Sequence, residues 1–203
     1  LDLMNRAMKA IRTRPEEEEA TYKSLAALNK AFKTLDAGHG VAELATAIGE
    51  FQYAPWLVAN LSLRRFPEER RGAPLSWDNV LYDSDALGYV VATHQHRTAH
   101  QDQTVFTWYQ ALCDGPPDRE RQRLLETPWA TWAERILRDL SKPHPDIREI
   151  VTRLDLMRWG HAMVRPWPGF VWGAARQRLE QARDRVLFAH SDLRGYSVFE
   201  EAH

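Results

Sequence analysis

Three histidines in the middle of the chain have a spacing that suits a metal ion. His94, His96 and His100 form the pattern H-x-H-x3-H, and Asp102 follows. Alternate residues of a strand point to the same side, so His94 and His96 are able to reach one zinc ion, and a third histidine after a turn completes a three-ligand catalytic site. The same pattern also fits a strand that ends at His94 and a polar loop. We therefore assign no metal ligands and keep a zinc hydrolase as an alternative.

The chain offers little for nucleophilic catalysis. Cys113 is the single cysteine, which excludes an intrachain disulfide and a cysteine-based zinc site. No neighbour of Cys113 in the sequence is suited to activate its thiol, and no serine is framed by glycines as a nucleophile. A catalytic thiol or serine is not indicated.

The end of the chain combines an apolar run with a turn and a helix start. Residues 186–192 are rich in strand-forming side chains, and Gly195 follows as a turn residue. Ser197 and Glu200 have the spacing of a capping box, which predicts that a helix begins at Ser197. Nucleating a helix is costly, so a single terminal turn is marginal. We expect the helix to continue beyond His203 in a longer protein.

The pattern along the chain predicts an α+β fold. Residues 1–50 are expected to be helical, and the texture then changes to strand-like segments separated by Gly, Pro and Asp turns: 51–63, 77–82, 87–94 and 103–112. These segments predict an antiparallel sheet of at least three strands, flanked by helices on one side. Later signals predict a helix that begins with Thr127 as N-cap, a short helix at 146–153, a strand at 154–159 and a helix at 172–183.

Four segments together resemble a family of flavoproteins. The terminal segment VLFAHSDLRGYSVFEEAH (186–203) resembles the C-terminal flavin motif of FAD-dependent amine oxidases and related desaturases, in which an apolar strand, an acidic residue, a glycine-containing turn and a helix follow one another. The segments YAPWLVANLSL (53–63), WDNVLYDSDALGYVVATHQ (77–95) and LMRWGHAMVRPWPGFVWG (156–173) are similar to one bacterial branch of these proteins. The resemblance implies an oxidoreductase with FAD as cofactor and a small-molecule substrate. It also implies three parts: a helical segment at 1–50, part of a substrate-binding domain at 51–185, and a strand and helix start of a Rossmann-like FAD domain at 186–203.

The resemblance assigns FAD contacts to the terminal segment. Asp192 takes the place of the acidic residue that hydrogen-bonds the ribityl or phosphate-linking part of FAD, and Ser191 takes it if the register shifts by one. Tyr196 belongs to the turn that follows. In the family, N–H groups at the start of the helix face the flavin and stabilise its reduced form. The helix start here gives that role to Ser197, Val198 and Phe199, the last two supplying the N–H groups.

The resemblance also implies contacts nearer the reaction. Trp159 falls where family members carry an aromatic residue beside the flavin. His161 and His94 are candidates for relaying a proton during hydride transfer to the flavin, because imidazole titrates near neutral pH. Tyr109 and Trp172 are candidates for lining the substrate cavity, although large apolar side chains more commonly pack in a core.

The chain departs from the family pattern in two respects. Gly38-His39-Gly40 lacks a third glycine and follows a helix, so it does not form the dinucleotide-binding motif, which we expect upstream in a longer protein. No lysine lies between Lys33 and Lys142, although many amine oxidases place a lysine near the flavin on a strand similar to residues 53–63. An amine substrate is therefore only one option.

The charge and the apolar content of the chain bear on the classes of partner that we expect. The formal net charge is −1, which gives no basic surplus for nucleic acid or an anionic membrane. No apolar run approaches the ~20 residues that span a bilayer, so we expect a cytoplasmic protein. A further alternative is a non-enzymatic interaction module with Trp56, Trp77 and Trp108 on an exposed face.

Overall fold

The computed structural model describes residues 46–69, 71–72, 74–95, 101–181 and 190–195. The chain divides into two compact units. Residues 52–165 form the sheet unit, and residues 46–51 belong with the described residues from 166 onward to the second unit. The architecture is α+β, which confirms the predicted class.

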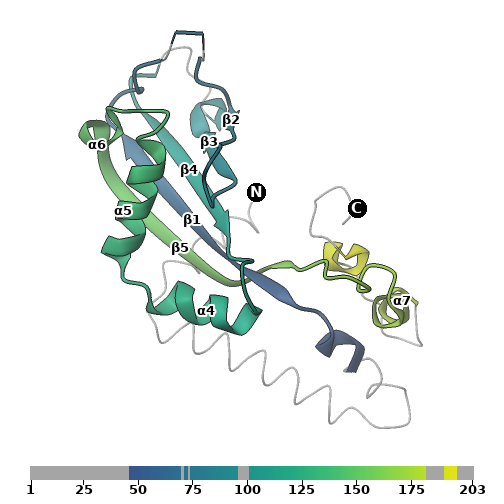
Figure 1. The fold of residues 1–203 in the computed structure, drawn as a ribbon. Coiled ribbons are helices and arrows are strands. Elements are labelled where there is room, and N and C mark those ends of the chain that lie inside the picture. Colours follow the sequence, from purple (N-terminus) through teal and green to yellow (C-terminus); the bar gives the residue numbers. More distant parts are fainter. Residues whose placement is uncertain (1–45, 70, 73, 96–100, 182–189, 196–203) are drawn as a thin grey trace. The chain divides into compact units, whose positions relative to one another are not determined.

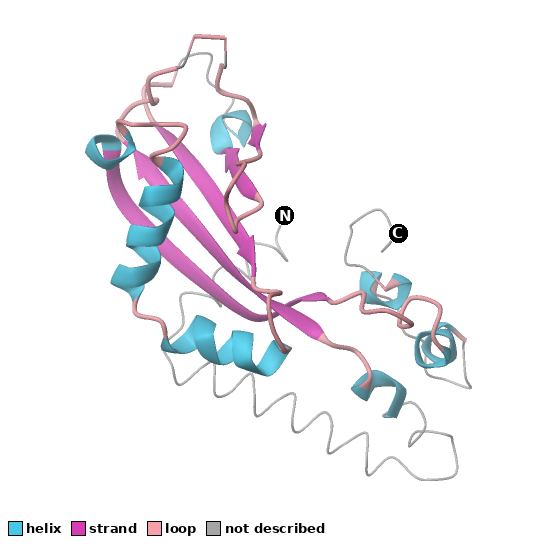
Figure 2. Cartoon of the chain, viewed as in Figure 1, coloured by secondary structure: helices cyan, strands magenta, loops and turns pink. Residues whose placement is uncertain are grey.

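The sheet unit is built on five antiparallel strands in the order β2-β3-β4-β1-β5 (Figures 1 and 2). The strands are β1 (Tyr53–Leu63), β2 (Asp78–Asn79), β3 (Gly88–Val91), β4 (Thr104–Ala111) and β5 (Val151–Val164). The predicted antiparallel sheet within residues 51–112 is confirmed. The strand predicted at 154–159 is also present, and it extends beyond that range at both ends.

Alternation of side chains along β1 and β4 separates a core face of the sheet from an open face. On β1, Leu57, Ala59 and Leu61 are fully buried, whereas the residues between them are half-buried. On β4, Phe106 and Trp108 are buried in the same way. Successive side chains of a strand point to opposite faces, so this period-two pattern is what a sheet with one covered face requires.

Helices cover the core face. They are α4 (Pro117–Glu126), α5 (Trp129–Leu140) and α6 (Ile147–Ile150). Their buried side chains pack with the core face of the strands in one apolar cluster, and the helical members are Leu124, Trp132, Ile136, Leu140, Ile147 and Ile150. Each such side chain contributes roughly 1.5–3 kcal/mol relative to an exposed position. The prediction of helices on one side of the sheet agrees with this cluster.

Several predicted boundaries are wrong for local reasons. The N-cap of α5 is Pro128, and Thr127 instead ends α4, where its hydroxyl donates to the carbonyl of Arg123 at 2.6 Å. The helix predicted at 146–153 ends at Ile150, because the following residues enter β5. The strand predicted at 87–94 ends at Val91 and passes into the 3-10 helix η2 (Ala92–Gln95). Of the segment 77–82, the strand β2 comprises Asp78 and Asn79.

The second unit holds a short helical segment at residues 46–49, α7 (Ala174–Glu180) and the 3-10 helix η3 (Ser191–Arg194). Ala47, Ala175 and Leu179 are buried together, and Leu193 of η3 packs against them. The strand predicted to reach residue 192 is therefore wrong at Ser191 and Asp192, which lie in η3. His190 begins η3 by accepting a hydrogen bond from the Asp192 backbone at 3.2 Å, which favours a tight turn over an extended chain. Residues 186–189 and the helix predicted from Ser197 lie outside the described residues.

In the parts of the chain that the structure describes, no helix combines the length and apolar character that crossing a membrane requires.

Candidate functional site

Three aromatic side chains lie in a row across the open face of the sheet. Trp56 on β1 is the direct register partner of Trp159 on β5, and its ring is stacked on that of Tyr109 on β4, with centroids 6.3 Å apart and an interplanar angle of 13°. We call Tyr109, Trp56 and Trp159 the aromatic row. Trp159 is 38% exposed, and the other two are half-buried. The row therefore offers partly accessible π surfaces on which a planar group can stack.

A polar edge accompanies the row. The Tyr109 hydroxyl donates to the Asp78 carboxylate of β2 at 3.3 Å. On β3, the register partner of Tyr109 is Gly88. Because glycine has no side chain, nothing at this position stands between the Tyr109 ring and Asp78. Burial, followed by the charge of Asp78 and this hydrogen bond, raises the pKa of Tyr109, so the phenol stays neutral near pH 7. The site can thus combine stacking with a neutral hydroxyl and a carboxylate.

His161 is set apart from the row by a bulge. Ala54 pairs with Met163, and Trp56 pairs with Trp159, so Pro55 alone lies opposite residues 160–162 of β5. The unequal number of residues on the two strands is a β-bulge, and a bulge redirects side chains. Trp159 and His161 therefore do not follow the simple alternation of a regular strand.

The surroundings of His161 favour its neutral form. Its ring lies 6.2 Å from that of Tyr53. His161 is exposed as a residue, but partial burial of its ring lowers its pKa most, the charge of Arg121 lowers the pKa further, and the charge of Asp118 opposes both effects. A neutral imidazole at neutral pH is able to accept a proton.

The predicted zinc ligands lie mostly outside the described residues. The backbone of His94 belongs to η2, and His96 and His100 fall outside. Among the residues that are described, no three His, Cys, Asp or Glu side chains come together to hold a metal ion. The zinc interpretation stays a prediction.

The residues assigned to FAD fall in two places. Trp159 lies in the sheet unit, whereas Ser191 and Asp192 lie on η3 of the second unit. Asp192 is 8% exposed, and its carboxylate lies 3.2 Å from Nδ1 of His190. The other assigned positions, Tyr196, Ser197, Val198 and Phe199, lie outside the described residues.

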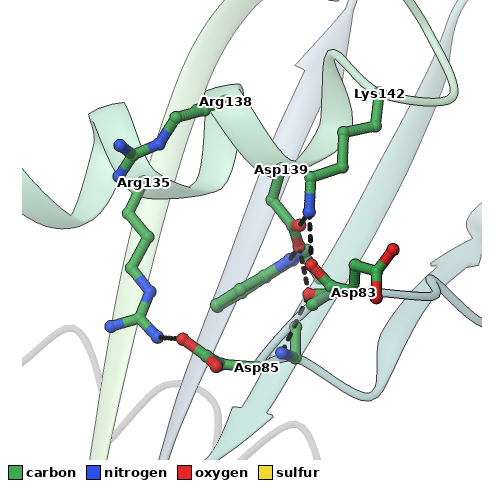
Figure 3. Close-up of a pocket in the computed structure, with 9 residues that line it drawn as sticks. Asp83, Asp85, Arg135, Arg138, Asp139 and Lys142 are labelled. Carbon is green, nitrogen blue, oxygen red and sulfur yellow. Dashed lines mark hydrogen bonds and ion pairs between the residues drawn. The ribbon is translucent and has the colours of Figure 1, made fainter.

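A polar cavity of about 260 Å³ lies between α5 and the loop that follows β2 (Figure 3). At its base the buried carboxylate of Asp139 accepts hydrogen bonds from Trp108 Nε1 at 3.0 Å, Ser84 Oγ at 2.7 Å and Lys142 Nζ at 3.2 Å. Lys142 also donates to the carbonyl of Asp83 at 2.6 Å. Because the carboxylate is already satisfied by three donors, the network ties the loop to α5 and β4 and is structural.

A second cavity, of about 300 Å³, has a buried tyrosine and histidine among its lining residues. The Tyr89 hydroxyl and His144 Nε2 are 2.6 Å apart, and both residues are less than a tenth exposed. Burial raises the pKa of Tyr89 to about 12, so the pair is joined by a neutral phenol. Neither cavity could be predicted from sequence patterns, because the residues that form each one are far apart along the chain.

Other predicted positions are placed differently. Trp77 is 61% exposed, but Trp108 is 1% exposed, so the expected exposed face with Trp56, Trp77 and Trp108 is wrong at Trp108. Trp172 is 81% exposed and does not line a buried cavity within its unit. Burial raises the pKa of Cys113, and this agrees with an unactivated thiol.

Comparison with known proteins identifies no family for this chain. No model of a protein family matches it, and a search of curated proteins found no match. The support for a function therefore comes from the chemistry of the described residues and from the resemblance of the sequence segments.

Proposed function

We propose that this chain is the C-terminal part of an FAD-dependent oxidoreductase of the amine-oxidase type, and that the aromatic row forms one wall of its substrate site. The observation that carries the proposal is the row itself, because Tyr109, Trp56 and Trp159 lie side by side on the sheet face opposite the helical core. A flat, partly exposed aromatic surface bordered by a neutral phenol suits a small organic molecule with a planar or apolar part.

The chemical groups of the described residues in the terminal motif are of types that suit FAD. Asp192 offers a carboxylate acceptor and Ser191 a hydroxyl, which suit the hydroxyl groups of a ribityl chain. The backbone then turns at Gly195 with φ of 85°, in keeping with the family's sequence of acidic residue and glycine-containing turn. When bound, FAD supplies the acceptor for a hydride from the substrate.

The chain's own residues would orient the substrate and move a proton. The aromatic row would hold the planar part of the substrate against the sheet. The Tyr109 hydroxyl would either donate to the substrate or keep its hydrogen bond to Asp78, which would fix the orientation of the Tyr109 ring. His161 supports the proton-relay role because burial and Arg121 lower its pKa, which keeps the imidazole neutral and able to accept a proton. His94 stays a second candidate for the same role.

The test is made on the longer parent protein, obtained by extending the coding sequence in both directions. We expect the purified parent to absorb near 450 nm and to release flavin on denaturation. Anaerobic titration with benzylamine or benzyl alcohol as probes then reports flavin bleaching. We expect Trp159→Ala to keep its flavin but to need about tenfold more of any probe that bleaches the parent, equivalent to ~1.4 kcal/mol of lost stacking.

Trp77→Ala is the matched control, because Trp77 is an exposed tryptophan of the same unit outside the aromatic row. A parent without flavin would refute the proposal, and stoichiometric zinc in that protein would favour the hydrolase. If Trp159→Ala and Trp77→Ala have the same half-saturating concentration, the aromatic row is not the substrate wall.

A further inference from the structure

The second unit contains a buried arginine that the proposed function has not used. Arg176 lies on α7 and is 8% exposed. Arginine is rarely buried to this extent unless its charge is paired and its N–H groups are hydrogen-bonded. Its contacts therefore show which groups satisfy the guanidinium and which segments the guanidinium links.

The guanidinium of Arg176 joins three segments. Its Nη1 donates to Glu180 Oε1 at 2.6 Å and to the carbonyl of Leu193 in η3 at 2.6 Å. Its Nε donates to the carbonyl of Val171, which precedes α7. Glu180 also pairs with Arg194 at 3.2 Å. One side chain thus connects the chain before α7, α7 itself and η3.

Packing at Gly195, which follows η3, supports the same arrangement. Gly195 has φ of 85°, and a Cβ at this position would lie 3.0 Å from Val171 Cγ2 and 3.4 Å from Val171 Cα. Leu193 packs against the buried cluster that includes Leu179. The segment 190–195 is consequently held at two points. Arg176 of α7 donates a hydrogen bond to the Leu193 carbonyl, and Gly195 packs closely against Val171.

We propose that Arg176 is a positioning residue for cofactor binding, because it fixes the η3 backbone that carries Ser191 and Asp192. This inference rests on the proposed function, which assigns those two residues to FAD. The planar guanidinium presents several N–H donors in a fixed fork, so it reaches two carbonyls and a carboxylate together. A lysine ammonium is a point charge on a flexible stem and does not reproduce this geometry.

The experiment uses the full-length parent with Arg176→Lys and Arg176→Met. Arg178→Met is the matched control, because Arg178 is an exposed arginine of the same helix. FAD affinity is measured by titrating flavin-free protein and following flavin fluorescence. Amide hydrogen exchange of residues 190–195 is measured on the same flavin-free protein. We expect at least tenfold weaker FAD binding and faster exchange at 190–195 in Arg176→Met, a smaller change in Arg176→Lys, and no change in Arg178→Met.

A double-mutant cycle with Asp192→Ala separates positioning from general destabilisation. If Arg176 acts through the segment that carries Asp192, the losses of FAD affinity in the two single variants do not add in the double variant. Additive losses, or unchanged FAD affinity in a folded Arg176→Lys or Arg176→Met protein, overturn the inference while leaving the proposed function intact. A wild-type parent that does not bind FAD overturns the proposed function and this inference with it.

Discussion

Asp139→Ala should strongly destabilise the sheet unit. The change removes the carboxylate that accepts from Trp108 and Ser84 (Figure 3), and it leaves the indole N–H of a residue that is 1% exposed without that acceptor. A hydrogen bond to a charged group contributes roughly 1.5–3 kcal/mol, and an unsatisfied buried donor costs a similar amount. The Lys142 ion pair adds little, because the lysine side chain is 48% exposed and screened by water. We expect the free energy of unfolding to fall by about 3 kcal/mol.

Urea unfolding of the 203-residue chain, followed by tryptophan fluorescence, measures this loss. Asp85→Ala is the control, because Asp85 belongs to the same loop and pairs with Arg135, but its side chain is 73% exposed. That surface pair should contribute less than about 1 kcal/mol. Asp139→Asn keeps one oxygen acceptor for Trp108 and should lie between Asp139→Ala and the wild type. If Asp139→Ala unfolds within about 0.5 kcal/mol of the wild type at the same denaturant slope, the carboxylate is not a structural tie.

Two further predictions concern the sheet unit. Burial and Arg121 lower the folded-state pKa of His161, so as the pH falls the unfolded chain binds this proton first. The stability that His161 contributes is therefore complete above its ordinary pKa and declines as the pH falls through that value toward the folded pKa. Arg121→Met should raise the His161 pKa, which an NMR titration measures. An unchanged pKa would show that the charge of Arg121 does not lower it. Gly88→Ala should destabilise the chain by about 2–4 kcal/mol, because φ is 139° and the new Cβ would lie 2.0 Å from the Asn79 carbonyl oxygen. Gly49→Ala, where a Cβ meets nothing within 4 Å, is the control in thermal melts, and equal melting temperatures would refute the strain at Gly88.

The sheet was predictable where a strand is bounded by turn residues and buried on one face. Residues 51–63 and 103–112 have alternating side chains and clear turn signals, and they form β1 and β4. The start of β5 was not predictable in the same way. α6 ends at Ile150 and β5 begins at the next residue, Val151, so no glycine or proline marks the change from helix to strand. Local signals identify an element best when the chain also marks where it stops.

The polar contacts of the core were beyond the reach of local patterns. Ser84 bonds Asp139, and Tyr89 bonds His144, each across 55 positions of sequence. Such pairs depend on which helix is packed over which strand, and sequence spacing carries no record of it. The ion pair of Arg176 with Glu180 is different, because a spacing of four on a helix places two side chains together. The sequence alone was enough to suggest that pair, but it gave no sign that the same guanidinium also holds η3.

His161 shows how a bulge decides where a side chain of a strand lies. Trp159 and His161 are two positions apart, and a regular strand would direct both to one face. β5 bulges across residues 160–162, opposite Pro55 of β1. The ring of His161 therefore lies near Tyr53, within the electrostatic reach of Arg121, while Trp159 stays paired with Trp56. If the proposed oxidoreductase uses both residues, the bulge is what separates a stacking group from a proton-accepting group only two positions away.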